Sequence, residues 1–404
     1  MSGLSALARV TGFTMIRFTC LGVITLILHT PFYADSLAEL SSTAKLPRTM
    51  AWSAYNLGTT GYNQAVAIGK VLKDKYGTTL RVIPGKNDIS RLVPLRKGRV
   101  HFTANGIATY LAQEGVFQFA QPSWGPLPLR LLISSNGLSN QALAVTRKSG
   151  ITKFEELRGK RIPWVRGAPA LNLSTEAMLA CGGLTWDDVQ RVDFPGYSSM
   201  WDGIINGFSD AAYGTTVSGP ATKLEASPQG IHWMEVPHND NDCWARLLKV
   251  APYFTRHTAV RGAAISTEQP HEGANYPYPL LTAMSDQKPA LVYAMTRAIH
   301  TNYDAFKDAD PGAIGWALKF QKFNWVVPIH DAAVQYWRDV GAWNANLEAH
   351  NNQLIRRQDV LAKAWQAAKA ETQASKPASS DQFKQRWLQI RKKHLQTAGF
   401  DPIW

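Results

Sequence analysis

The sequence predicts an α/β protein with two similar lobes, each a mainly parallel sheet with flanking helices, followed by a helical C-terminal extension. Segments with strand character alternate with segments of helical spacing, and this alternation builds a parallel sheet covered on both faces. The second part of the alternation repeats the first in kind, and in both the main helix opens on a small-residue turn. Beyond Val327 the pattern changes to long polar helices.

Length and composition describe a large globular protein. The chain has 404 residues, 45% of them hydrophobic, and 14 tryptophans, which is enough to bury a sizeable core. The formal net charge of +13 would suit a nucleic acid or a membrane surface. The basic residues are scattered, however, apart from the start and the last twenty residues, and no nucleic-acid motif accompanies them. We therefore expect no nucleic-acid partner.

Residues 1–34 are predicted to be a signal peptide. A charged start precedes the apolar run Leu21–Leu28, and Ala34 supplies a small residue at a plausible cleavage point. Met15 is an alternative start to Met1. An uncleaved anchor is disfavoured because the run is short for a bilayer. We therefore expect a protein exported to the periplasm.

Two cysteines, Cys181 and Cys243, remain after cleavage. In an oxidising compartment they could pair, but free buried thiols are the alternative, and nothing in the sequence brings them together. The histidines are isolated, and no Cys or His pair has metal-ligand spacing. We expect neither a metal nor a cofactor.

The first lobe opens with a strand around Trp52, a Gly/Thr-rich turn and a helix from Tyr62 onward. Backbone N–H groups at such a helix start can hold an anion. Asn87 or Asp88 is predicted to cap a second helix, which Pro94 shortens or kinks. The further elements are strands at 79–83, 100–105 and 127–134 and a helix at 107–114.

The second lobe begins near Ala142 and has its own Gly/Pro turn before its main helix. Its predicted strands are 142–146, 160–165, 191–194, 210–215 and 231–235, and its helices are 171–181, 198–207 and 219–225. Two such lobes in series indicate a ligand cleft between them, at the carboxyl ends of both sheets. Arg166, at a strand end, could clamp a carboxylate with two parallel hydrogen bonds, or it could be an ordinary surface arginine.

We divide the chain into lobe 1 at residues 49–140 and 240–330, lobe 2 at 141–239 and a helical extension at 331–404. The crossovers near Asn140 and Asn239 are expected to act as hinges. The last helix places Phe383, Trp387, Ile390 and His394 on one face and basic residues elsewhere. It could touch an anionic membrane, but we favour packing of its apolar face on the body.

The chain resembles the extracytoplasmic solute-binding proteins of TAXI-type TRAP transporters. The likeness runs from about Thr49 to about Phe320, and it rests on the order and spacing of several segments rather than on any one motif. These segments are Leu57–Asn63, Ile83–Leu92, Arg99–Asn105, Ala144–Ile151, Phe154–Arg161 and Asn206–Tyr213.

The resemblance implies a type II periplasmic-binding-protein fold, without an enzymatic activity, that closes on a small organic anion. Such anions are commonly an amino acid or a dicarboxylate, which the protein, a monomer, delivers to TRAP membrane subunits. The ligand contacts that it implies are Thr59, Thr60, Gly61, Tyr62, Asn87, Asn105, Arg166, Gly167, Asn172, Thr215 and Thr216. The first turn reads Thr-Thr-Gly-Tyr-Asn where relatives more often have a Gly-Gly-Thr-Tyr-Tyr type of run.

Two other functions remain as alternatives. The first is a periplasmic sensor or scavenger that passes its ligand to a signalling partner. The second is an enzyme on the same two-lobed fold, which is disfavoured because no Ser or Cys nucleophile appears with an activating base in a recognisable motif.

Overall fold

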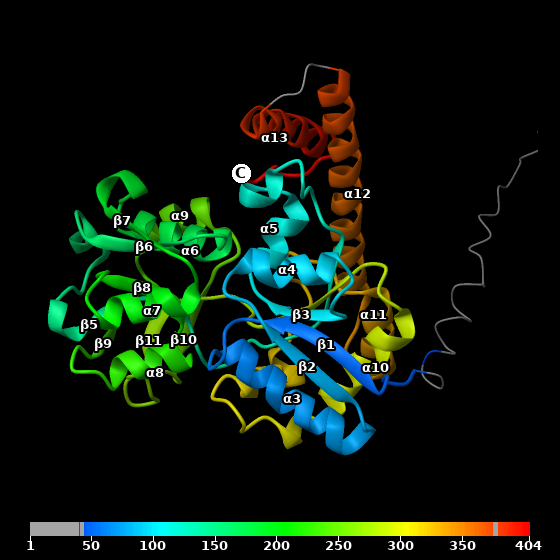
Figure 1. Cartoon of the computed structure of the whole chain (residues 1–404), viewed down its shortest axis with the longest axis horizontal. Helices are drawn as coiled ribbons and strands as arrows, with labels where there is room; N and C mark the ends of the chain where they lie inside the picture. The colour runs from blue at the N-terminus through cyan, green and yellow to red at the C-terminus, as the bar shows by residue number, and fades with distance from the viewer. Residues whose placement is uncertain (1–39, 41–43, 375–378) are drawn as a thin grey trace, which may run out of the picture.

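A computed structural model describes residues 40, 44–374 and 379–404, so the predicted signal peptide lies outside the described residues. The predicted α/β fold with two lobes is confirmed (Figure 1). One lobe holds the chain from β1 to β4 and from β12 onward, the other holds β5 to β11, and a long helical arm rises from the first lobe.

Lobe 1 is built on a sheet with the strand order β2-β1-β3-β12-β4. Strand β1 pairs in parallel with β2 and β3, whereas β12 runs antiparallel to both β3 and β4. In the middle of this sheet Trp52 packs its buried ring against the edge of Phe102, with centroids 6.1 Å apart. The strands are β1 (Thr49–Ala54), β2 (Thr79–Pro84), β3 (Phe102–Asn105), β4 (Leu129–Ser134) and β12 (Leu280–Met284).

The first three helices of lobe 1 begin within two residues of their predicted starts. Asn87 caps α4 by accepting a hydrogen bond from the Ser90 N–H at 2.8 Å, and α4 continues past Pro94 for only two residues. The lobe 1 helices are α3 (Thr60–Tyr76), α4 (Asp88–Arg96), α5 (Ala108–Glu114), α10 (Pro289–Thr301) and α11 (Asp331–Asp339), and the 3₁₀ helices are η1 (Phe117–Ala120), η5 (Tyr303–Ala305), η6 (Ala313–Trp316) and η7 (Leu318–Phe320).

Lobe 2 contains two sheets that form one layer, with the orders β8-β5-β9 and β6-β7. Strand β5 is antiparallel to β8 and β9, and only β6–β7 is parallel. The sheets of both lobes are therefore mixed, whereas we predicted mainly parallel sheets. In each lobe, the first strand after a crossover (β5 or β12) is antiparallel to both of its neighbours. The strands are β5 (Gln141–Thr146), β6 (Arg161–Val165), β7 (Gln190–Phe194), β8 (Ala211–Thr215), β9 (Ile231–Trp233), β10 (Thr255–Ala259) and β11 (His271–Asn275).

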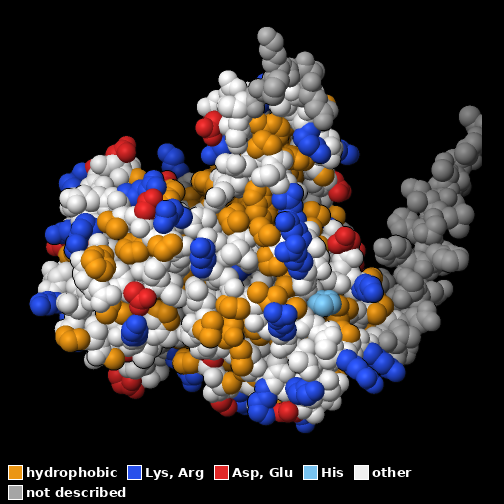
Figure 2. Space-filling view, viewed as in Figure 1, with side chains coloured by type: hydrophobic (Ala, Val, Ile, Leu, Met, Phe, Trp, Pro, Cys, Tyr) orange, Lys and Arg blue, Asp and Glu red, His pale blue; other side chains and the backbone are white. Residues whose placement is uncertain are grey.

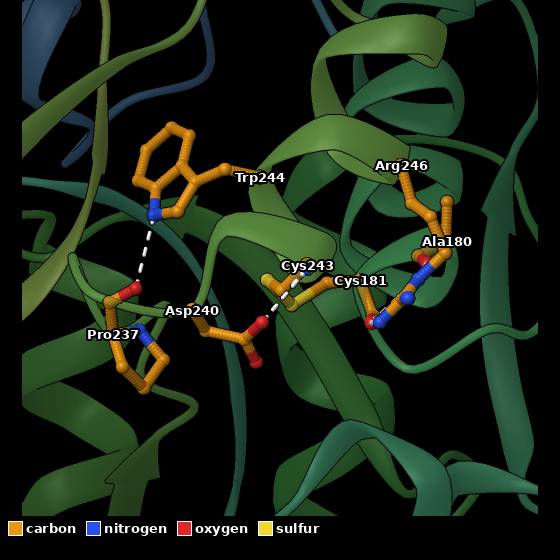
Figure 3. Close-up of a disulfide and its surroundings, with 7 residues drawn as sticks. All are labelled: Ala180, Cys181, Pro237, Asp240, Cys243, Trp244 and Arg246. Atoms are coloured by element: carbon orange, nitrogen blue, oxygen red, sulfur yellow. Dashed lines mark hydrogen bonds between the residues drawn. A yellow bond between two sulfur atoms is a disulfide. The ribbon is translucent and has the colours of Figure 1, made fainter.

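The second lobe does not end at Asn239, where we placed the return to lobe 1. A disulfide between Cys181 and Cys243 joins the end of α6 to the start of α9 (Figure 3), and β10 and β11 then pair beside β5. The chain returns to lobe 1 after Asn275. The prediction missed this because the mixed, polar sequence of α9 does not indicate which lobe the helix covers. The lobe 2 helices are α6 (Pro169–Cys181), α7 (Tyr197–Ile205), α8 (Gly219–Glu225) and α9 (Asn241–Val250), with the 3₁₀ helices η2 (Arg147–Ser149), η3 (Phe154–Leu157) and η4 (Trp186–Asp188).

Two short crossovers, at 135–140 and 276–279, connect the lobes. They lie side by side: the Ser135 N–H donates to the Pro279 carbonyl at 2.8 Å, and the Asn275 side chain donates to that of Asn136 at 3.1 Å. The predicted crossover near Asn140 is present, whereas the second lies at 276–279 rather than near Asn239. Paired segments of this kind can act as a hinge, because few dihedral angles need to change.

A buried histidine stands beside the first crossover. The Asn140 side chain contacts the His271 Nδ1 at 3.0 Å and the His257 Nδ1 at 2.7 Å, and the His271 Nε2 lies 3.2 Å from the Met234 carbonyl. Burial lowers the pKa of His271 from 6.5 to about 4. The folded protein therefore holds this imidazole neutral at pH values where the unfolded chain would protonate it.

We expect the free energy of unfolding to fall as the pH falls from about 6.5 to about 4. In this window the unfolded state binds a proton at His271 that the folded state does not, which costs at most roughly 3 kcal/mol. Urea unfolding of the parent and of His271→Gln at pH 7.5 and pH 5 measures the effect. The variant should lose less stability on acidification, and an equal loss in both proteins would contradict the prediction. Burial also lowers the pKa values of His257 and His330, so part of the dependence should remain in the variant.

The C-terminal extension begins later than residue 331, because α11 packs on α10 and β4 within lobe 1. It consists of α12 (Ala345–Ala374) and α13 (Ser380–Thr397), which pack on each other and on α5 and η1. Trp365 and Trp387 meet edge to face, with centroids 4.8 Å apart. The last helix thus packs its apolar face on the body, as we favoured.

A buried ion cluster attaches this extension to lobe 1. Glu114, at the end of α5, accepts two hydrogen bonds of 2.8 Å from Arg357 of α12 and a further one from Arg391 of α13. Burial alone would raise the pKa of Glu114, but the two guanidinium groups hold it below its ordinary value. All three side chains are buried, so removing Glu114 would leave two buried cations without their counter-ion.

The lysine and arginine side chains do not form a single patch on the face seen in Figure 2. They are spread over both lobes and the extension. Among the described helices, none is both long enough and apolar enough to cross a membrane.

Candidate functional site

A small enclosed cavity lies between the lobes, at the carboxyl ends of β1, β3 and β8. Its volume is about 30 Å³, which is room for about one water molecule. Lobe 1 and the second crossover contribute Tyr55, Thr59, Thr60, Asp88, Arg91, Gly106, Ile107, Tyr276 and Tyr278, and lobe 2 contributes Gln141, Ala170, Leu171, Tyr197, Tyr213, Gly214, Thr215 and Ser218.

The charged groups of this cavity are an ion pair on one turn of α4. Arg91 donates to the Asp88 Oδ1 at 2.7 Å, and its guanidinium lies over the Tyr55 ring, 3.5 Å from the centroid. The Tyr55 hydroxyl donates to the same carboxylate oxygen at 3.1 Å. Asp88 and Arg91 are both buried. Asp88 and Arg91 therefore bind each other, and Tyr55 contacts both of them. Such contacts offset the cost of removing two charges from water.

Asp88 also bridges the lobes. Its Oδ2 accepts a hydrogen bond of 2.9 Å from the Ala170 N–H, in the first turn of α6. The N–H donors at such a helix start can bind an anionic ligand. In this structure a carboxylate of the protein itself takes one of those donors, in the position that the helix dipole favours for an anion.

Further contacts hold the two lobes together around the cavity. The Asn87 side chain donates to the Arg166 carbonyl at 2.9 Å, and the Tyr197 N–H donates to the Lys86 carbonyl at 3.0 Å. Gly167 has a φ of 72°, and a Cβ there would lie 2.6 Å from the Asn87 amide nitrogen, so this approach requires glycine. The lobes are therefore closed in this structure.

Five tyrosines surround the cavity. Tyr55 of lobe 1 and Tyr197 of lobe 2 stack with ring centroids 5.0 Å apart, and Tyr213, Tyr276 and Tyr278 complete the set. Burial raises the pKa values of these hydroxyls. They consequently stay protonated and can donate hydrogen bonds.

Three buried polar atoms of this lining make no hydrogen bond within the described part of the chain. They are the Nε of Arg91, the Tyr213 hydroxyl and the Ser218 hydroxyl. Buried polar atoms are rarely left unpaired, because each costs about 1–3 kcal/mol. A ligand that accepts hydrogen bonds could satisfy all three.

The predicted contacts fall into separate groups. Thr59, Thr60 and Thr215 line the cavity, and Gly61 lies behind it, against Tyr278. Asn87 does not line the cavity but makes a hydrogen bond between the lobes, to the Arg166 carbonyl. Tyr62 is half-buried and does not line the cavity.

The remaining predicted residues do not reach the cavity. The Asn105 side-chain oxygen Oδ1 accepts from the Gly106 N–H, and the Thr216 hydroxyl accepts from the Asn140 N–H and donates to the Arg261 carbonyl. Three others, Arg166, Gly167 and Asn172, line a larger groove of about 540 Å³ on the opposite side of the first turn of α6.

Our sequence analysis missed Arg91, the five tyrosines and Ser218 as site residues, and it took Asp88 only as a possible helix cap. Asp88 and Arg91 are three apart on a helix that follows a strand end, and this spacing was the available signal. The tyrosines are spread from residue 55 to residue 278 and had no local signal. No cluster of His, Cys, Asp or Glu suited to a metal ion occurs among the described residues.

Two α/β lobes that are joined by paired crossovers and enclose a cavity define the fold class of the two-lobed periplasmic binding proteins. The chain belongs to the NMT1-like family, whose model matches residues 56–341. That match ends just after α11, so α12 and α13 lie outside it.

Solved structures with a similar fold share little sequence with this chain. An ancestral arginine-binding protein bound to arginine is 12% identical, with 65% of this chain and 96% of that chain covered and a TM-score of 0.42. The alkanesulfonate-binding protein SsuA from Xanthomonas axonopodis pv. citri, bound to MOPS, is 15% identical, with 84% and 99% covered and a TM-score of 0.44. A periplasmic binding protein from Brucella ovis with glutathione bound is 13% identical, with 68% and 76% covered and a TM-score of 0.39.

The comparison with curated proteins finds no match.

Proposed function

We propose that this protein is the extracytoplasmic solute-binding subunit of a TAXI-type TRAP transporter, and that it captures a small carboxylate between its lobes. The observation that carries the proposal is the interlobe cavity, with the unpaired N–H of Arg91 and the unpaired hydroxyls of Tyr213 and Ser218 on its wall. A carboxylate has two acceptor oxygens with about four lone-pair sites, so one group could serve all three donors. The assignment to a TRAP system rests on the sequence resemblance.

Ligand entry requires the lobes to separate. A cavity of about 30 Å³ cannot take an amino acid or a dicarboxylate in its present shape. The ligand would enter an open form and then replace part of the contact between the lobes as they close. Small-angle scattering of the ligand-free protein should therefore show a mixture of open and closed forms that becomes more compact with ligand.

The first test is a thermal-shift screen of the signal-free protein against organic acids, amino acids, sugars and metal ions. A carboxylate at a hundredfold excess over its dissociation constant should add about 2.7 kcal/mol of stability. Stabilisation by sugars or cations alone would contradict the proposal.

The second test removes the two unpaired hydroxyls with Tyr213→Phe and Ser218→Ala. Neither hydroxyl makes a well-formed hydrogen bond among the described residues, so we expect an unchanged or slightly raised melting temperature without ligand. Affinity for the carboxylate found in the screen should fall roughly 5- to 100-fold per variant, measured by calorimetry.

The matched control is Tyr253→Phe. The Tyr253 hydroxyl is hydrogen-bonded to Ser174 at 3.1 Å and does not line the cavity. This variant should lose stability and keep its affinity. If Tyr213→Phe and Ser218→Ala bind as tightly as the parent, the cavity is not the site.

A further inference from the structure

The groove beyond the first turn of α6 is formed by three separate parts of the chain. Lobe 1 supplies η1, lobe 2 supplies the end of β6 and the start of α6, and the C-terminal extension supplies Lys384 of α13. The lining residues are Phe117, Gln118, Gln121, Trp164, Arg166, Gly167, Pro169, Asn172, Leu173, Glu176 and Lys384. Its volume of about 540 Å³ lies in the range of small-molecule sites.

We propose that this groove is a second ligand site, distinct from the enclosed cavity, which binds an amphipathic aromatic anion. Such a ligand would place its ring beside Trp164 and Phe117 and its anionic group between Arg166 and Lys384. The proposal does not depend on which solute the enclosed cavity takes.

The charges of the groove favour an anion. The Arg166 guanidinium belongs to lobe 2 and the Lys384 ammonium to the C-terminal extension, and neither has an ion-pair partner among the described residues. The acidic residue of the lining, Glu176, accepts a hydrogen bond from the Trp186 indole, and burial raises its pKa. The lining therefore combines two cations that have no ion-pair partner among the described residues with one carboxyl that ionises less readily than usual.

The aromatic walls are held in place by their own contacts. The Trp164 ring packs against Trp186, with centroids 5.1 Å apart, and the Arg191 guanidinium lies over its face at 4.3 Å. Phe117 has a φ of 54°, a left-handed backbone that a bulky residue rarely adopts. Its ring packs against Trp404, the last residue, with centroids 5.7 Å apart.

The chain end also connects the groove to lobe 2. The Trp404 indole N–H donates to the Val250 carbonyl of α9 at 3.1 Å, while Arg391 of α13 donates to the Trp404 carbonyl at 3.0 Å. The extension therefore lines one side of the groove through Lys384 and is also hydrogen-bonded to α9 of lobe 2. The first turn of α6 separates the two sites: Pro169 and Asn172 face the groove, whereas Ala170 and Leu171 face the enclosed cavity.

The experiment uses the complete signal-free chain and 1-anilinonaphthalene-8-sulfonate, a fluorescent aromatic sulfonate. Its titration should give a saturable site, and N-phenyl-1-naphthylamine, which has nearly the same rings without the sulfonate, should bind at least about tenfold more weakly. Arg166→Gln and Lys384→Gln should each weaken the sulfonate about tenfold, the effect of losing one charge-assisted hydrogen bond.

Lys392→Gln is the matched control, because Lys392 is exposed on the same helix and does not line the groove. It should change the affinity less than twofold, as should Tyr213→Phe in the enclosed cavity. The proposal is overturned if the sulfonate does not saturate, if the uncharged amine binds equally well, or if either groove variant keeps the parent affinity while its circular dichroism is unchanged.

Discussion

Replacing Glu114 by glutamine is expected to lower the free energy of unfolding by about 3–5 kcal/mol. The carboxylate is fully buried and accepts hydrogen bonds from Arg357 and Arg391, each on a different helix of the extension. The amide keeps the shape of the side chain but removes the negative charge, so two buried guanidinium groups lose their counter-ion. Urea or thermal unfolding followed by circular dichroism measures the loss.

The extension should also detach more easily in this variant. Arg391 donates to the backbone carbonyls of the last three residues, so the chain end depends on the same cluster. We expect trypsin to cleave within 379–404 faster than in the parent. The control is Asp74→Asn, which breaks an exposed pair with Lys70 and should cost less than about 1 kcal/mol. Equal losses in the two variants would show that the buried cluster contributes no more than a surface pair.

Replacing both Cys181 and Cys243 by alanine is expected to cost about 4 kcal/mol. The disulfide spans 62 residues, and opening a loop of this length returns that much conformational freedom to the unfolded chain. It also fixes α9 to α6, where Arg246 donates to the Ala180 carbonyl at 2.9 Å (Figure 3). Urea unfolding under non-reducing conditions measures the difference between the variant and the parent.

The matched control is the parent protein unfolded and refolded with a reducing agent, which should have the same urea midpoint as the double variant. Both should keep lobe 1 intact longer than lobe 2, because the bond lies within lobe 2. A double variant whose midpoint equals that of the oxidised parent would mean that the disulfide contributes nothing to stability.

Part of the candidate site was predicted from the sequence, whereas the ion pair of Asp88 and Arg91, the five tyrosines and Ser218 were not. Thr59, Thr60 and Thr215 follow strand ends, a position that local pattern identifies, and they line the cavity. Arg166 also follows a strand end, but its side chain faces the groove instead. Periodicity places a residue at the end of a strand and does not say on which side of the next helical turn its side chain lies.

The sequence by itself determined the α/β alternation, the division into two lobes with a helical extension, and a cap for α4 at Asn87 or Asp88, of which the structure uses Asn87. These depend on spacing, turn residues and caps within a few positions of one another. Only the tertiary structure decided that α9 to β11 belong to lobe 2, that Cys181 meets Cys243, and which charges meet. Asp88 contacts Ala170 across 82 positions, and Glu114 contacts Arg357 across 243. Such contacts form because a buried charge has lost its water and needs a partner within the protein. The fold decides which partner is near, and that partner can be far away along the chain.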